Sequence, residues 1–86
     1  MEYDKKVINR LKRIEGQLKG VLGMMEQGKD CRDIIIQLSA ARNAIDRTMG
    51  VIVSTNLEKC VRENIERGDG TEHLVKEAVD LLIKSR

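Results

Sequence analysis

Two cysteines and an asparagine are the residues of this chain whose types and spacing suggest chemistry. Cys31 and Cys60 are the only cysteines among 86 residues, and Asn56 precedes Cys60 by about one helical turn. A transition-metal site at this spacing would want a third donor, typically an imidazole, and an amide is a poor partner for a soft metal. The pair is therefore better suited to thiol chemistry, in which one thiolate is modified and the second resolves it.

The only histidine, His73, is the remaining candidate for a metal ligand. It lies far from both cysteines in the sequence and would reach them only through tertiary packing. We therefore expect a surface histidine, and we predict neither a bound metal nor another cofactor.

Length and composition limit the scaffold that holds these residues. A chain of 86 residues is one small domain, residues 1–86, and it contains no Pro, Trp or Phe. Apolar content from Ile, Leu, Val, Met and Ala beside 35% charged residues is typical of helices that pack against copies of themselves. The sequence begins with no apolar leader and its longest apolar runs are three residues. We expect an oligomeric, cytoplasmic protein with no membrane segment and with reduced cysteines.

Glycines and capping residues divide the chain into three helical segments, so the predicted fold is all-α. For the first helix, Asp4 is a suitable N-cap and Gly28 a suitable stop. Its apolar residues alternate at spacings of four and three and form one seam: Val7, Leu11, Ile14, Leu18, Val21 and Met25.

The second helix is predicted to start at Asp30 and to continue through Gly50 to about Arg67. The loop 68–70 then separates it from a short third helix that opens at Thr71. The apolar line of the second helix is Ile34, Leu38, Ile45, Met49 and Ile52. The apolar residues of the third helix are Leu74, Val75, Ala78, Leu82 and Ile83.

Basic residues gather along both flanks of the first helix's seam. Residues 1–29 carry seven Lys or Arg against four Asp or Glu. The residues on one flank are Lys6, Arg13 and nearby Arg10, and those on the other are Lys5, Lys12 and Lys19. Such a face is compatible with nucleic acid, and equally with an ordinary solvated helix surface.

Helix geometry keeps the two cysteines of one chain apart. Along one continuous helix, 29 residues separate them by roughly 44 Å, and a disulfide needs Cα atoms within about 7 Å. If two copies pack antiparallel, residues whose numbers sum to about 91 lie side by side, which brings Cys31 against the partner's Cys60. Near the two-fold axis Ile45 then meets the partner's Asp46. The alternative is that each cysteine is a small buried hydrophobe.

Three ordered blocks of sequence resemble a known family over nearly the whole chain. The blocks are NRLKRIEGQLKG (9–20), DCRDIIIQLSAARNAID (30–46) and NLEKCV (56–61). They resemble the copper-sensing operon repressor family, CsoR/RcnR/FrmR-like. The resemblance implies an all-helical tetramer, a dimer of antiparallel dimers, that binds operator DNA without a helix-turn-helix.

The resemblance also implies roles for individual residues. In copper-sensing members the site is a cysteine from one subunit with a histidine and a cysteine from the other. Cys31 and Cys60 match these cysteines, while Asn56 occupies the position of the histidine. The chain is thus most similar to the persulfide-sensing CstR branch, which controls sulfide-detoxification genes. The family's DNA-contacting positions correspond to Arg10 and Arg47, with three supporting basic residues, Lys6, Lys12 and Arg13.

Four functions remain open at this point. The favoured one is a repressor, not an enzyme, that binds operator DNA when reduced and is released when a persulfide or polysulfide links Cys31 to the partner's Cys60. The second is a copper(I)-responsive repressor that uses the same two thiolates. The third is a small sulfurtransferase, although no acid–base group stands near the cysteines, and the fourth is a purely structural helical oligomer.

Overall fold

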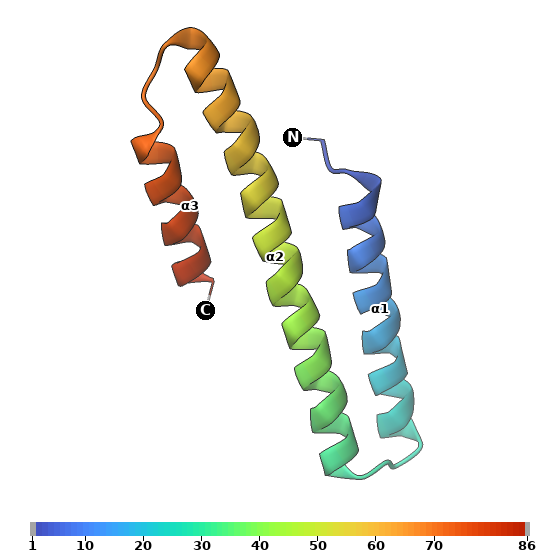
Figure 1. Ribbon diagram of the computed structural model, residues 1–86. Coiled ribbons are helices and arrows are strands. Elements are labelled where there is room, and N and C mark those ends of the chain that lie inside the picture. The colour runs from blue at the N-terminus through green and yellow to red at the C-terminus, as the bar shows by residue number, and fades with distance from the viewer. Residues whose placement is uncertain (1, 86) are drawn as a thin grey trace. The chain divides into compact units, whose positions relative to one another are not determined.

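Three α-helices make up the chain, as predicted from its sequence. The computed structural model describes residues 2–85, and within that range the helices are α1 (Lys5–Glu26), α2 (Cys31–Arg67) and α3 (Glu72–Lys84), with no strand between them (Figure 1). The all-α prediction is confirmed, and the helix order is that of the three predicted segments.

The two ends of α1 are set by the predicted residues. The Asp4 side chain accepts a hydrogen bond of 2.6 Å from the backbone N–H of Lys6 and so caps the free donors of the first turn. Past the last turn, Gly28 has a φ of 71°, in the left-handed region that favours glycine. The N–H groups of Gly28 and Lys29 donate to the carbonyls of Met25 and Met24. This pair of bonds is the Schellman arrangement, which satisfies two carbonyls at the helix end.

The long helix α2 starts one residue later than predicted, at Cys31. The Asp30 carbonyl accepts from the N–H of Ile34 at 3.2 Å, so Asp30 precedes the helix rather than opening it. As predicted, the helix continues through Gly50 and ends at Arg67.

A second turn of the same kind follows α2, and side chains reinforce it. Gly68 has a φ of 78°, and the N–H of Asp69 donates to the Asn64 carbonyl at 2.8 Å. Buried Asn64 also donates from Nδ2 to the Gly70 carbonyl at 2.8 Å and accepts from Arg67 Nη2 at 2.6 Å. Because each of these polar atoms is satisfied, the turn between α2 and α3 is well defined.

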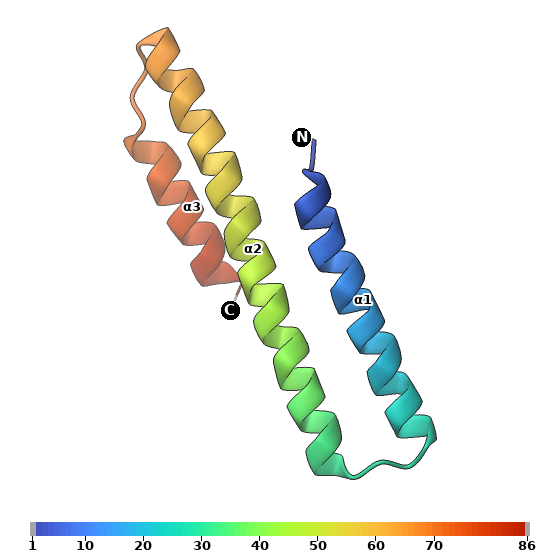
Figure 2. The same ribbon diagram turned by 45° about the vertical axis from the view of Figure 1, so that its right-hand side comes forward.

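The chain consists of two compact units that share α2, an N-terminal one ending at Thr48 and a C-terminal one beginning at Met49. In the N-terminal unit, α1 runs alongside the first part of α2 in both views (Figures 1 and 2). The buried residues of this unit come from both helices: Val7, Ile14, Val21, Ala41 and Thr48.

The predicted seam of α1 is divided between two faces. Ile14 is 5% exposed against α2, whereas Leu11 and Leu18 are 50% and 41% exposed. Small Ala41, 2% exposed, lets the two helices approach closely, so only every second member of the seam is covered. Leu38 and Ile45 of α2, predicted to be apolar contact positions, are likewise exposed within one chain.

In the C-terminal unit, α3 packs on the last part of α2 through few residues. Ala78 and Asn64 are buried and Leu74 is half-buried, while Val75 and Ile83 are exposed. The predicted apolar positions of α3 are therefore only partly covered within one chain.

None of the helices in residues 2–85 combines the length and the apolar character needed to cross a membrane.

Candidate functional site

A pocket rich in arginine lies between α1 and α2 in the N-terminal unit. It has a volume of about 350 Å³, and we call it the arginine pocket. Its lining residues are Arg10, Arg13, Ile14 and Gln17 from α1 and Ala44, Arg47 and Thr48 from α2.

The fold of the α1–α2 hairpin explains why these side chains meet. Arg10, Arg13 and Gln17 are spaced by three and four residues, which places them on one side of α1. On α2, Arg47 directly precedes Thr48, whose hydroxyl donates to the Ala44 carbonyl at 2.8 Å. Thr48 is 3% exposed and its hydroxyl is satisfied, so it forms part of the floor of the pocket.

The three arginines form no ion pair with a carboxylate of residues 2–85. Within residues 2–85 the ion pairs are Arg62 with Glu58 and Arg67 with Asp69, and neither includes an arginine of the pocket. A guanidinium carries five N–H donors in a planar fork that suits the oxygens of phosphate. Three of them around one concavity form a surface that can bind a polyanion.

Two of the five predicted DNA-contacting residues lie outside this pocket. Lys12 lines an apolar groove on another side of α1, and the side chain of Lys6 is exposed near the start of that helix. Gln17 and Thr48 line the pocket but were not predicted from the sequence. Gln17 follows Arg10 by seven residues, and that periodicity was the available signal.

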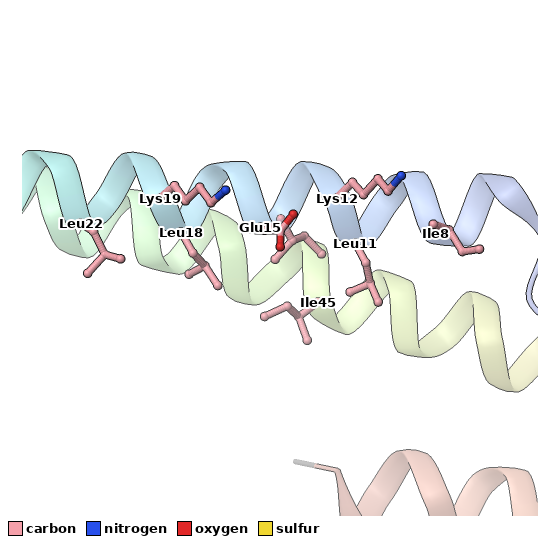
Figure 3. Close-up of a pocket in the computed structure, with 9 residues that line it drawn as sticks. Ile8, Leu11, Lys12, Glu15, Leu18, Lys19, Leu22 and Ile45 are labelled. Carbon is pink, nitrogen blue, oxygen red and sulfur yellow. The ribbon is translucent and has the colours of Figure 1, made fainter.

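The apolar groove runs along α1 and includes one residue of α2. Figure 3 shows Leu11, Leu18 and Leu22 pointing to the same side as Ile45. The groove has a volume of about 760 Å³, and Lys12 and Lys19 stand along it. We call it the leucine groove. It contains Leu11 and Leu18, two members of the α1 seam that α2 leaves uncovered.

Cys31 is the first residue of α2 and is exposed. It follows the Schellman turn at Gly28 by three residues, so that turn determines where the thiol emerges. The N-terminus of a helix carries free N–H groups and partial positive charge, which stabilise negative charge nearby.

Cys60 lies in the C-terminal unit, half-buried beside Asn56. Its Sγ lies 3.9 Å from Asn56 Oδ1, and the thiol donates to the amide oxygen. An amide also carries N–H donors, so after rotation it can serve a thiolate instead. Asn56 is therefore a suitable neighbour for sulfur in either protonation state.

The two cysteines belong to different units of the chain, Cys31 to the N-terminal one and Cys60 to the C-terminal one, and both are free. Within residues 2–85, no three side chains of the His, Cys, Asp and Glu types are grouped so that they could hold a metal ion. His73 lies in the first turn of α3 and is exposed, as predicted.

The side chain beside Cys60 is poorly suited to complete a three-donor site for a soft metal. The side chain one turn before Cys60 is an amide whose oxygen is a hard donor, where copper(I) prefers thiolate or imidazole.

Known proteins resemble this chain over most of its length. The family model described as a metal-sensitive transcriptional repressor matches residues 3–84. The protein YrkD of Bacillus subtilis is 73% identical over 63 residues, which are 73% of this chain and 100% of YrkD. The copper-sensing transcriptional repressor CsoR of the same organism is 37% identical over 78 residues, 91% of this chain and 76% of CsoR.

Among solved structures, the nickel-responsive transcriptional regulator InrS is similar with a TM-score of 0.80 and 33% identity, covering 94% of this chain and 93% of InrS. The all-helical arrangement, the matched family model and the similarity to CsoR agree with one another. This chain belongs to the CsoR/RcnR family of metal-sensitive transcriptional repressors.

Proposed function

We propose that this repressor binds operator DNA through its arginine pocket and releases it when a persulfide or polysulfide links Cys31 to the partner's Cys60. As a member of a repressor family, the chain is a transcriptional regulator and not an enzyme. The genes under its control, on this proposal, are those for sulfide detoxification.

The observation that carries the proposal is the amide beside Cys60. Asn56 Oδ1 lies 3.9 Å from Cys60 Sγ, at the position that the family resemblance assigns to a metal-binding histidine. With an amide there, the site offers two soft donors, the two thiolates, instead of three. Two thiols without a third ligand remain fully able to exchange sulfur.

The DNA-binding half of the proposal is supported by charge. Arg10, Arg13 and Arg47 line one pocket without a carboxylate partner in residues 2–85. Each phosphate that such groups neutralise contributes about −0.9 to the slope of log affinity against log salt concentration. Operator binding should therefore weaken steeply as salt is added.

The sulfur-sensing half requires an antiparallel dimer. The leucine groove leaves Leu11 and Leu18 half exposed in one chain, which is a favourable surface for a second copy. Packing the α2 helices antiparallel places Cys31 beside the partner's Cys60 at both ends of the dimer. Two such dimers form the proposed tetramer.

The sulfur chemistry balances without a further oxidant. The Cys31 thiolate attacks the outer sulfur of a persulfide, RS–SH, which transfers that sulfur and releases the thiol RSH. The partner's Cys60 thiolate then attacks the inner sulfur of the Cys31 persulfide, forming a disulfide and expelling hydrosulfide. If both cysteines carry persulfides, their reaction gives a trisulfide and releases one hydrogen sulfide.

A covalent bridge affects DNA binding only if it favours one shape of the assembly. The bridge links two chains at each end of the dimer and restricts how their α2 helices move. It biases the tetramer toward a shape whose arginine pockets no longer match the spacing of DNA phosphates. The effect on DNA affinity equals the difference in bridge stability between the two shapes.

A copper(I)-responsive repressor is the second candidate. Copper-sensing relatives favour it, and soft thiolates select copper(I). Here the metal itself, held by Cys31 and the partner's Cys60, would replace the sulfur bridge.

One titration separates the two candidates. The complex of the reduced protein with operator DNA is treated with glutathione persulfide, with copper(I), or with glutathione as the thiol control. We expect release by the persulfide together with a covalent dimer on non-reducing electrophoresis, and no release by glutathione. Release by near-stoichiometric copper(I) with no response to the persulfide would overturn the proposal in favour of the second candidate.

A further inference from the structure

One face of α2 in the N-terminal unit is apolar but uncovered. Ile35, Leu38 and Ile45 are 54%, 36% and 37% exposed, and their spacing places them on one side of the helix. Two exposed charged residues, Arg42 and Asp46, lie on the same side. An apolar stripe that includes a few charges is typical of a surface that another helix covers.

Arg42 and Asp46 are four residues apart, a spacing at which opposite charges on one helix can pair. The ion pairs within residues 2–85 are Arg62 with Glu58 and Arg67 with Asp69, so neither residue is paired in this way. Both charges are available to a group outside the chain.

We propose that Arg42 pairs with the partner's Asp46, and that this pairing sets the register of the two α2 helices. The inference rests on the antiparallel dimer of the proposed function, in which residues whose numbers sum to about 91 lie side by side. Arg42 then faces the partner's Met49, and the partner's Asp46 is displaced by three residues, a rise of about 4.5 Å. The long side chain of arginine spans that offset.

The two-fold axis makes the pairing reciprocal. Because Asp46 faces the partner's Ile45, the two Asp46 carboxylates lie close to the axis and to each other. The four charges form a row, with an arginine at each end and the two carboxylates between them. Each Arg42 therefore offsets the repulsion between the two Asp46 carboxylates.

The row of charges also disfavours other registers. Sliding the helices by one heptad in one direction places Arg42 opposite the partner's Arg42. Sliding them by a heptad in the other direction separates each arginine from its aspartate by roughly 15 Å along the axis. Of these three registers, the one that aligns Cys31 with the partner's Cys60 has the smallest rise between Arg42 and the partner's Asp46, about 4.5 Å against about 6 Å and about 15 Å, and it does not place the two arginines opposite each other.

Charge reversal tests the pairing. The variants are Arg42→Glu, Asp46→Arg and the double variant, each with both cysteines present. Self-association is measured by sedimentation, and the link between Cys31 and the partner's Cys60 is measured by diamide oxidation and peptide mapping. Arg62→Glu is the matched control, because Arg62 is on the same helix and pairs with Glu58 in its own chain.

Each single reversal should weaken association on the order of a hundredfold and reduce the mapped link in proportion, because all four charges then have one sign. The double variant should recover both, since it restores opposite charges in swapped positions. This recovery, with helicity followed by circular dichroism, distinguishes lost pairing from failed folding. Arg42→Ala should also weaken association more than Asp46→Ala, because only the former leaves two carboxylates facing each other.

The outcomes distinguish this inference from the proposal on which it rests. If the wild-type dimer forms no link between Cys31 and the partner's Cys60, the antiparallel arrangement itself is wrong. If the wild type links but the single reversals behave like Arg62→Glu, the arrangement stands and the ionic register is wrong.

Discussion

The arginine pocket is assembled by two helices of a single chain, whereas the two thiols are free cysteines in different units of that chain. Arg10 and Arg13 reach Arg47 because α1 folds directly back on α2. Cys31 is the first residue of α2, whereas Cys60 lies in the part of α2 that belongs to the C-terminal unit. On the proposed function, the DNA-binding surface forms with the fold of one chain, whereas the sulfur site forms only with assembly. Such a repressor would respond to sulfur only as an oligomer.

The largest effect is expected from removing one thiol per chain, which tests whether the sulfur site needs cysteines from two chains. Cys31→Ala and Cys60→Ala should each abolish the persulfide-induced covalent dimer, because every bridge needs one cysteine of each kind. Mixing the two variants should restore bridging, since a mixed dimer contains one complete site. Intact mass and non-reducing electrophoresis measure the result.

Reduced operator binding provides the control for that experiment. Both variants should bind DNA like the wild type, because neither cysteine lines the arginine pocket. A covalent dimer from either variant alone would contradict the pairing of Cys31 with the partner's Cys60.

The pocket can be disrupted while the thiols remain intact. Arg10→Ala and Arg47→Ala should each weaken operator binding by about 1.5–3 kcal/mol, roughly ten- to hundredfold, because a charge-assisted hydrogen bond is lost. Electrophoretic mobility shift against salt concentration measures both the affinity and the slope. Persulfide should still cross-link these variants.

Lys12→Ala is the matched control for the arginine variants, since Lys12 lines the leucine groove and not the pocket. A loss of affinity as large as that of Arg47→Ala would place the DNA-binding surface over the outer face of α1 instead.

Asn56→His tests whether the residue one turn before Cys60 occupies a metal-ligand position. The substitution adds an imidazole one turn before Cys60 and so completes a set of three soft donors with the two thiolates. We expect copper(I) affinity to rise roughly tenfold or more, measured by competition with a chromophoric chelator. Operator release should then respond to copper(I). An unchanged affinity would show that Asn56 does not occupy the metal-ligand position.

The smallest expected effect concerns the turn that precedes Cys31. Gly28→Ala places a side chain at a φ of 71° with no neighbour within 4 Å of the new Cβ, so only the backbone opposes it. The free energy of unfolding should fall by about 1–2 kcal/mol. Gly16→Ala in α1 also meets no neighbour within 4 Å and should stabilise the helix by about 0.5–1 kcal/mol.

Denaturant unfolding measures both glycine variants at one protein concentration. Equal changes of the same sign would contradict the assignment of Gly28 to a left-handed turn.

The helix ends could be predicted from the sequence because they depend on local chemistry. Asp4 caps α1 and Gly28 ends it through hydrogen bonds within a few residues. The residues at the start of α3 were predicted for the same reason, although Thr71 makes no capping bond with its side chain.

The division of the α1 seam could not be predicted in the same way. Val7, Leu11 and Leu18 have similar hydrophobicity, yet Val7 is 8% exposed and both leucines remain at least 41% exposed. Periodicity identifies apolar positions but does not reveal whether the same chain or another copy covers them. The contributions of Ala41 and Thr48 depend on how closely α1 approaches α2, which is a tertiary property.

The arginine pocket was only partly predictable for a related reason. Arg10 and Arg47 were identified through the family resemblance, but the proximity of Arg47 to Arg10 and Gln17 depends on the relative rotation of two helices. Lys12 lies on the other flank of α1 from Arg10 and Arg13, and in the structure it lines the leucine groove instead of the pocket.

The thin core has a consequence for how the protein exists in a cell. Within residues 2–85 no large side chain is less than 2% exposed, and only five apolar residues are buried. For such a chain, folding and association are coupled, so the melting temperature should rise with protein concentration. Newly made chains would remain vulnerable to proteases until they find partners. The number of functional repressors would then rise more than proportionally with the rate at which the chain is synthesised.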